Sequence, residues 1–92
     1  MARITYAQLL PVVARINRIT NSPAEPYHEQ DGQWLPNADN FHLESGNDGY
    51  QLARMCKVGT GTNNVLGTGY LKPAELYHLM HAFIKGLEFK HG

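Results

Sequence analysis

The chain has 92 residues, of which 42% are hydrophobic and 17% are charged, and its formal net charge is zero. This length predicts one domain, residues 1–92, with a small core, and the composition excludes a disordered chain. A single cysteine, Cys56, excludes an intrachain disulfide and a cysteine-built zinc site, and no stretch is apolar enough to span a membrane. We therefore expect a cytoplasmic protein of a reducing compartment.

Charge is unevenly distributed along the sequence. Residues 1–24 carry three arginines and no acid, whereas residues 25–48 carry six acids and neither Lys nor Arg. Residues 49–92 carry five bases and two acids, so the net charges of the three parts are +3, −6 and +3. The acidic middle part gives no overall attraction to a polyanion, although a local basic patch could still face one.

The first predicted element is a helix near residues 9–19. Its apolar residues recur at helical spacing and form one stripe, namely Leu9, Val12, Val13, Ile16 and Ile19. Two starts are consistent with the sequence: a capping box between Thr5 and Gln8, or a regular start near Pro11. The Asn-Ser-Pro sequence at 21–23 ends the helix.

A first β-hairpin is predicted around Asp31-Gly32, which is a strong two-residue turn signal. It joins a strand at 27–30 to a second strand at 33–35. Pro36 is expected to end this second strand because proline has no amide hydrogen to donate.

A second hairpin is predicted to join residues 41–45 to residues 50–58 through the four-residue connection 46–49. If Ser45 faces Tyr50, the helix-facing side of this hairpin pairs Leu43 with Leu52 and Phe41 with Arg54. The other side then pairs Glu44 with Gln51 and His42 with Ala53. Within the inward row, we expect the Arg54 stem to pack on Phe41 while the guanidinium reaches solvent or a carboxylate.

The glycine-rich stretch at residues 59–69 invites comparison with phosphate-binding loops. A P-loop needs a lysine directly after its last glycine and a helix starting there, and neither is present. The dinucleotide pattern fails because Asn64 and Lys72 stand where its third glycine belongs. We interpret 59–64 as a hairpin tip that could contact a partner, 65–66 as strand and 67–69 as a bend.

The last predicted element is a helix from Pro73 to Gly86. Pro73 suits a first helical position, Glu75 the first turn and Lys85 the last turn, and Gly86 is placed to end the helix. The predicted buried stripe comprises Leu76, Leu79, Met80, Phe83, Ile84 and Leu87. The element order therefore predicts an α+β fold with an N-terminal helix, a three- to four-stranded antiparallel sheet and a C-terminal helix packed on one face.

The candidate catalytic residues do not assemble into an enzyme. His78 and His81 could share a metal, but Glu75 is the only further ligand nearby. Cys56 lies in the inward row of a strand, where a thiol is an ordinary small apolar group. The acidic residues flank turns and form a solvated rim. We expect no catalysis, no cofactor, no metal and no small-molecule substrate.

Direct nucleic-acid binding is the alternative function. Arg15, Asn17 and Arg18 lie beside the stripe of the first helix and could contact phosphates. Four aromatic side chains could stack on bases, namely Tyr27, Trp34, Tyr50 and Tyr70. The sequence lacks a duplex-reading motif. This alternative predicts a small phage regulator that binds nucleic acid through a basic patch on the first helix.

Residues 40–88 resemble a group of small proteins encoded by phages and integrated mobile elements. The similarity rests on the sequence Gly-Tyr-Gln-Leu-Ala-Arg-Met at 49–55, on Gly69-Tyr70 and on the helical sequence from Glu75 to Leu87. Among such proteins the chain is most similar to anti-CRISPR inhibitors of the type I-F kind. The resemblance implies a non-enzymatic blocker in a bacterial host cell. Such a blocker binds Cas subunits of the crRNA-guided surveillance complex, with room for contacts to the guide RNA, and prevents target DNA from pairing.

A blocker of this kind needs a rigid surface with a few aromatic or arginine anchors. The expected contact residues are Arg15 and Arg18 on the first helix, Asn47, Asp48 and Tyr50 at the central turn, and Arg54. Acidic side chains offer a second route, because a surveillance complex grips DNA with basic grooves. The side chains expected to occupy such grooves are Glu29, Asp31 and Asp48.

Overall fold

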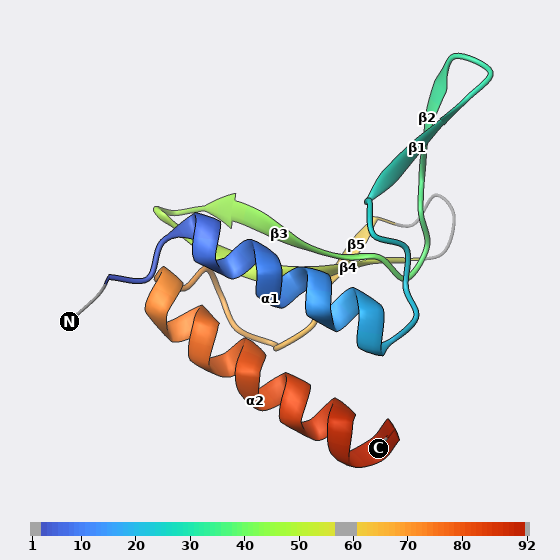
Figure 1. The fold of residues 1–92 in the computed structure, drawn as a ribbon. Helices are drawn as coiled ribbons and strands as arrows, with labels where there is room; N and C mark the ends of the chain where they lie inside the picture. The colour runs from blue at the N-terminus through green and yellow to red at the C-terminus, as the bar shows by residue number, and fades with distance from the viewer. Residues whose placement is uncertain (1–2, 57–60, 92) are drawn as a thin grey trace.

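The computed structural model describes residues 3–56 and 61–91 and has an α+β fold (Figure 1). Within these ranges the helices are α1 (Tyr6–Ile19) and α2 (Pro73–His91), and the strands are β1 (Tyr27–Gln30), β2 (Gln33–Pro36), β3 (Phe41–Gly46), β4 (Gly49–Met55) and β5 (Thr62–Asn64). Strands β1 and β2 form one antiparallel sheet, and β3, β4 and β5 form a second one in that order. The predicted α+β class is confirmed, and the strands prove to be divided between two sheets.

Helix α1 begins at the earlier of the two starts that the sequence allows. The amide nitrogen of Thr5 donates to Oε1 of Gln8 at 2.8 Å, and the amide nitrogen of Gln8 donates to the Thr5 carbonyl at 3.0 Å. Pro11 therefore lies inside the helix and removes one hydrogen bond from it. The predicted stripe is confirmed: Leu9, Val12, Val13 and Ile16 are buried, and Ile19 packs against them.

The pairing of β3 with β4 has the predicted register, with Phe41 opposite Arg54, Leu43 opposite Leu52 and Ser45 opposite Tyr50. The connection is shorter than predicted, because Gly46 and Gly49 already belong to the strands. Asn47 and Asp48 both have positive φ, 47° and 61°, as a two-residue type I′ turn requires. Asparagine and aspartate tolerate this conformation better than other non-glycine residues.

Arg54 is held as the sequence predicts. Its guanidinium carbon lies 5.8 Å from the centroid of the Phe41 ring, and its Nη2 lies 2.6 Å from Oδ1 of Asp39. The aromatic ring thus packs on the cationic group while a carboxylate neutralises it.

Strand β5 lies earlier in the sequence than predicted. Thr62, Asn63 and Asn64 pair with β4, whereas Val65 and Leu66 form a turn and pack against the core instead of extending the strand. Strand β4 ends at Met55, and the half-buried Cys56 follows it. The prediction that Cys56 lies within this strand is therefore wrong. Residues 57–58 of the predicted extension and residues 59–60 of the predicted glycine tip lie outside the described residues.

Helix α2 continues through Gly86 to His91, so the prediction that Gly86 ends it is wrong. A glycine inside a helix costs only about 1 kcal/mol relative to alanine, and the half-buried Leu87 beyond it packs against the core. The predicted buried stripe needs one correction, because the side chain of Leu79 is 40% exposed. The buried positions of α2 are Leu76, Met80 and Ile84, spaced four apart.

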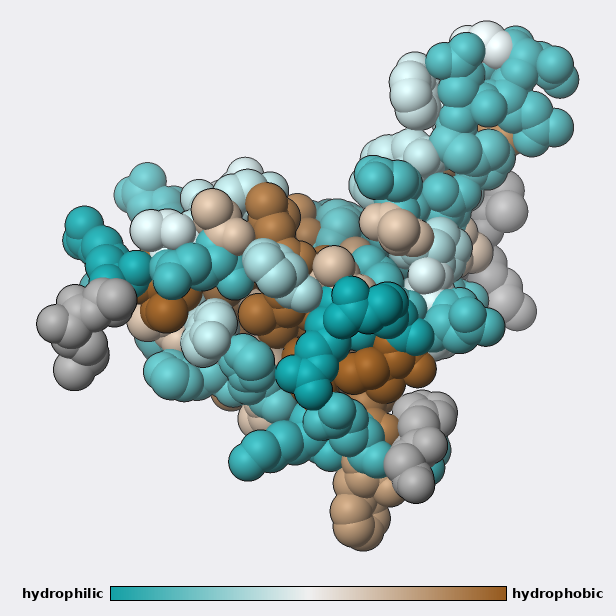
Figure 2. Space-filling model, viewed as in Figure 1, coloured by the Kyte–Doolittle hydropathy of each residue, from teal (hydrophilic) through white to brown (hydrophobic). Residues whose placement is uncertain are grey.

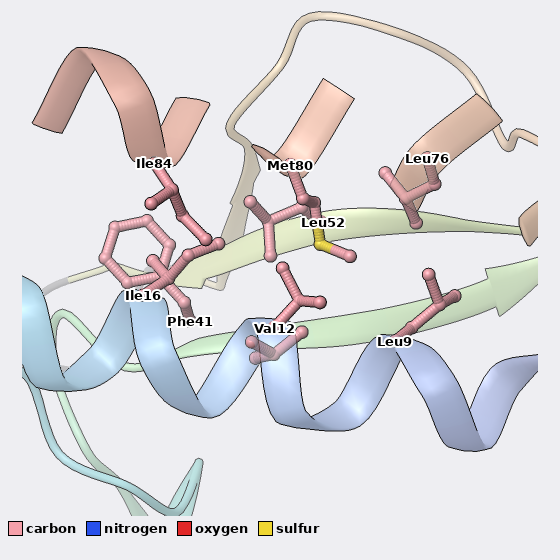
Figure 3. Packing of buried hydrophobic residues seen from close by; sticks show 9 residues of the cluster. Leu9, Val12, Ile16, Phe41, Leu52, Leu76, Met80 and Ile84 are labelled. Atoms are coloured by element: carbon pink, nitrogen blue, oxygen red, sulfur yellow. The ribbon is translucent and has the colours of Figure 1, made fainter. Parts of the chain in front are cut away.

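The core lies between the two helices and one face of the three-stranded sheet (Figure 3). Phe41 and Leu52 project from that face toward side chains of both helices. Five of these helical side chains are Leu9 and Ile16 from α1 and Leu76, Met80 and Ile84 from α2. Because both helices cover the same face, the opposite face of this sheet carries no helix.

Candidate protein-interaction surface

The β1–β2 hairpin, residues 27–36, is called the arm here, and it projects from the rest of the molecule (Figure 1). Its turn residues Asp31 and Gly32 both have positive φ, 53° and 79°, which gives the predicted type I′ turn. Side chains from 27 to 34 are exposed, and the last strand residue is Pro36. An isolated two-stranded hairpin is marginally stable in water, so the arm depends on how its base is held.

Asn37 holds the base of the arm. Its amide nitrogen donates to the Pro26 carbonyl at 2.8 Å, and its side-chain Nδ2 donates to the Glu25 carbonyl at 2.9 Å. The Oδ1 atom of Asn37 is hydrogen-bonded to Nδ1 of His28 on β1. One side chain thus joins the segment before β1 to the segment after β2, which fixes the direction in which the arm leaves the body.

One face of the arm combines aromatic and acidic side chains. The register places Glu29 directly opposite Trp34 and Tyr27 directly opposite Pro36, so these four residues share a face. Trp34 is 68% exposed and Tyr27 is 50% exposed. Together with Glu25 and Pro26 they line a shallow groove of about 370 Å³. Exposed tryptophan and tyrosine next to a groove are typical anchors of protein–protein interfaces.

The carboxylates at the arm form no ion pair with a described residue. Within residues 3–56 and 61–91, no ion pair involves Glu25, Glu29 or Asp31, and all three residues are exposed. Figure 2 accordingly shows the arm as a mostly hydrophilic projection. The neighbouring acid Asp39 differs, because Arg54 neutralises it. Three exposed acids without an ion pair to a described residue therefore lie on or beside the arm, and a fourth, Asp48, lies in the β3–β4 turn.

The predicted contact residues at the β3–β4 turn lie at the other end of the three-stranded sheet from the arm (Figure 1). Asn47 and Asp48 are exposed in this turn. Tyr50 is half-buried, and its ring centroid lies 5.1 Å from that of Tyr6. The ring of Tyr70 covers Gly46, where an added Cβ would lie 2.7 Å from the ring. The structure thus separates Asn47, Asp48 and Tyr50 from Glu29 and Asp31.

The basic residues predicted on the first helix do not form an open patch. The Nη2 atom of Arg15 lies 2.8 Å from Oε2 of Glu88 on α2, so this charge is already paired. Asn17 is buried and bonds the main chain of Phe41, so its predicted contact with phosphates is wrong. Arg18 is exposed and is the remaining candidate on this helix.

The helix-free face of the three-stranded sheet carries a polar cluster centred on Glu44. Its Oε1 accepts a hydrogen bond from Gln51 at 2.9 Å, and its Oε2 accepts one from Thr62 at 2.9 Å. Nε2 of His42 lies 3.8 Å from the same Oε2. The hydrogen bond from Gln51 lowers the pKa of Glu44 most. Thr62 and His42 lower it further, and partial burial opposes them.

The residues considered for chemistry are used for packing or turns. His81 packs edge-on against Tyr77, with ring centroids 4.5 Å apart, and His78 is exposed. In the part of the chain that the structure describes, no three metal-ligating side chains come together. Gly61 and Gly67 have positive φ, 85° and 69°, so the described part of the glycine stretch turns the chain.

Sequence reasoning listed Trp34 and Tyr27 only as possible base-stacking residues and did not single them out as anchors. The sequence did contain a signal for their exposure. The arm has polar residues on both faces, because His28, Gln30 and Gln33 lie opposite the face that carries Glu29. A strand pair with polar or charged side chains on both faces has no wholly apolar side to bury against a core.

No protein-family model, curated protein or solved structure matches the chain. Neither described helix combines the length and the apolar character needed to cross a bilayer.

Proposed function

We propose that the protein is a non-enzymatic inhibitor of the anti-CRISPR kind, which binds the Cas subunits of a crRNA-guided type I-F surveillance complex through the arm. The observation that carries this proposal is the arm itself: it projects, its side chains are exposed, and its carboxylates lack ion-pair partners among the described residues. The resemblance of residues 40–88 to small phage proteins supplies the identity of the target.

The chemistry of the arm suits a groove that normally holds nucleic acid. Such grooves present lysine and arginine to phosphates, and Glu29 and Asp31 can occupy part of the same positions. Trp34 and Tyr27 add apolar contact area, which provides affinity that charge alone does not. Occupying the groove would prevent target DNA from pairing with the guide.

Direct nucleic-acid binding through α1 has weaker support. Of the three residues predicted to contact phosphates, Arg15 is paired with Glu88 and Asn17 is buried, which leaves Arg18 free within the described part of the chain. One arginine gives little attraction to a polyanion.

The test uses a purified type I-F surveillance complex loaded with guide RNA. The expected result is co-elution with the intact protein and loss of target-DNA binding in a mobility-shift assay. The double variant Glu29→Gln/Asp31→Asn should weaken inhibition at least tenfold. The matched control is Asp48→Asn, which removes an exposed carboxylate at the other end of the sheet and should leave inhibition unchanged.

Failure to co-elute with the complex and to reduce its DNA binding would refute the proposal. A shift with free DNA or RNA that falls steeply with salt and is lost in Arg15→Ala/Arg18→Ala would instead support the regulator alternative. Equal loss of inhibition in the Asp48→Asn control would show that binding does not depend specifically on the arm.

A further inference from the structure

The outer edge of β3 has main-chain groups that β4 does not use. Gly46 and Gly49 flank the two-residue turn, so they form a hydrogen-bonded pair. Because such pairs alternate along an antiparallel ladder, the next hydrogen-bonded pairs are Glu44 with Gln51 and His42 with Ala53. The amide and carbonyl groups of Phe41, Leu43 and Ser45 therefore point away from β4. Their partners in β4 behave accordingly: Tyr50, opposite Ser45, exchanges two hydrogen bonds of 2.8 Å with Leu71 on its other side.

Asn17 occupies this outer edge at Phe41. Its Nδ2 donates to the Phe41 carbonyl at 3.0 Å, and its Oδ1 accepts from the Phe41 amide at 2.8 Å. These are the two bonds that a residue of a neighbouring strand would make. Within the described ranges, no turn, loop or side-chain hydrogen bond uses the main chain of Leu43 or Ser45. The edge is thus open for two residues beyond the one that Asn17 covers.

An apolar groove runs beside the open edge. A space of about 350 Å³ lies between α1 and β3, and its walls include Leu10 and Ala14 from α1 and Leu43 from β3. A second hollow of about 270 Å³ continues it between Tyr6, Leu43, Ser45 and Tyr50. Leu10 and Tyr6 are both exposed. Figure 2 shows hydrophobic surface where α1 passes in front of β3.

A second copy of the chain cannot bond both open residues of this edge in a favourable two-fold register. With Phe41 occupied by Asn17, a two-fold β3–β3 pair would bond Leu43 to Ser45 of the other copy and place Glu44 opposite Glu44. Like charges directly opposite each other destabilise a strand pair. The pKa of Glu44 is lowered, so both carboxylates would be ionised near neutral pH.

We propose that the β3 edge at Leu43 and Ser45 binds an extended segment of a partner protein as an added antiparallel strand. The segment places apolar side chains opposite Leu43 and Ser45, on the side of the α1 groove, and a lysine or arginine opposite Glu44 on the helix-free face. Main-chain bonds supply affinity and the two faces supply specificity, as in other cases of strand addition. The α1 groove reaches Glu25 and Pro26, which also line the groove of the arm, but the open edge at Leu43 and Ser45 lies outside residues 27–36. The proposal does not depend on the proposed inhibitor function.

The test uses the acetylated, amidated peptide Thr-Val-Lys-Val-Thr, titrated into isotope-labelled full-length protein and followed by amide NMR. The expected result is saturable shifts at Leu43 and Ser45 and slower hydrogen exchange of both amides, with the arm amides unchanged. Methylating the peptide nitrogens that face β3 should weaken binding by roughly 5- to 150-fold, because two hydrogen bonds at roughly 0.5–1.5 kcal/mol each are lost.

A charge exchange provides the matched control. The variant Glu44→Lys should bind the lysine peptide less tightly and the peptide Thr-Val-Glu-Val-Thr more tightly, and its unchanged NMR dispersion shows that it is folded. Ser45→Pro removes one outward amide while keeping the β4 ladder, and it should also weaken binding. Absence of shifts at β3 with millimolar peptide, equal binding of the methylated peptide, or concentration-dependent self-association through β3 would each overturn the proposal.

Discussion

Tyr50 of β4 and Leu71, two residues before α2, exchange two main-chain hydrogen bonds of 2.8 Å each. This bridge joins the start of the last helix to the middle strand of the sheet. It requires close approach of the two backbones, because an added Cβ at the neighbouring Gly49 would lie 2.6 Å from the Leu71 carbonyl oxygen. A glycine at position 49 is therefore part of how α2 is placed on the sheet.

We predict that Gly49→Ala destabilises the fold by about 1–3 kcal/mol, because the obstructing atom belongs to the backbone and cannot rotate away. Gly46→Ala is the matched control on the facing strand. Its added Cβ would meet only the ring of Tyr70, which lies at the surface and can move. Urea unfolding should give a clearly smaller loss for Gly46→Ala, and equal losses would contradict this explanation.

The hydrogen bonds between Asn17 and Phe41 predict a large effect of a small substitution. Asn17→Ala leaves a buried amide and a buried carbonyl of Phe41 without partners, which should lower the free energy of unfolding by about 2–4 kcal/mol. Gln30→Ala on the exposed arm is the control and should change stability by less than about 0.5 kcal/mol. A loss below about 1 kcal/mol for Asn17→Ala would show that water replaces the amide.

The course of α2 through Gly86 predicts a stabilising substitution. No atom lies within 4 Å of a Cβ built at Gly86, so alanine fits without a clash. Gly86→Ala should raise the free energy of unfolding by about 0.5–1 kcal/mol, because it restricts the unfolded chain and favours helix. Thermal unfolding with circular dichroism measures this. A decrease in stability would mean that α2 ends at Gly86, as the sequence alone predicts.

The sequence predicts the elements that depend on local patterns. The stripe of α1, the turn at Asp31-Gly32 and the pairing of Leu43 with Leu52 follow from apolar spacing and from turn residues. The errors have a different origin. Glycine ends many helices, but at Gly86 the packing of Leu87 against the core outweighs this weak preference. The sequence alone predicts an exposed polar side chain at Asn17. Its buried partner, the main chain of Phe41, is identified only from the position of β3.

The candidate site was harder to predict than the fold. Glu29 and Asp31 were identified from charge, but the projection of the arm depends on the contacts of Asn37 with Glu25 and Pro26. Such side-chain contacts to irregular backbone leave no periodic signal in the sequence. Likewise, the charge of Arg15 looks free until Glu88, 73 residues away along the chain, is placed beside it.

The lowered pKa of Glu44 predicts a pH dependence of stability. Because this carboxyl binds its proton less tightly in the native state than in the unfolded chain, its contribution is fully present above the ordinary pKa of 4.5. The contribution is lost as the pH falls through the lower native value. Glu44→Gln should therefore flatten the fall in stability between about pH 6 and about pH 3.

Gln51→Ala serves as the partial control for the Glu44 prediction. It removes the hydrogen bond that lowers the pKa most but keeps the carboxylate, so the pH slope should be intermediate. Urea unfolding at a series of pH values gives the slopes. A wild-type slope in Glu44→Gln would place the pH dependence at other groups.

A substitution of Trp34 distinguishes an effect on binding from an effect on folding. Its side chain is 68% exposed and is the only tryptophan, so acrylamide should quench the emission of the free protein efficiently. Trp34→Ala should change the free energy of unfolding by less than about 0.5 kcal/mol, because the side chain contributes little to the core. The same change should abolish most binding to a surveillance complex, since exposed tryptophans that become buried are typical hot spots.

Phe89 on α2 is the matched control for Trp34, because it is also aromatic and is 93% exposed, but it lies away from the arm. Phe89→Ala should leave complex formation unchanged. In the wild-type complex, the emission of Trp34 should become protected from acrylamide. If the complex forms and acrylamide still quenches Trp34, the arm is not the contact. If Trp34→Ala and Phe89→Ala weaken binding equally, the loss reflects exposed aromatic surface in general and not the arm.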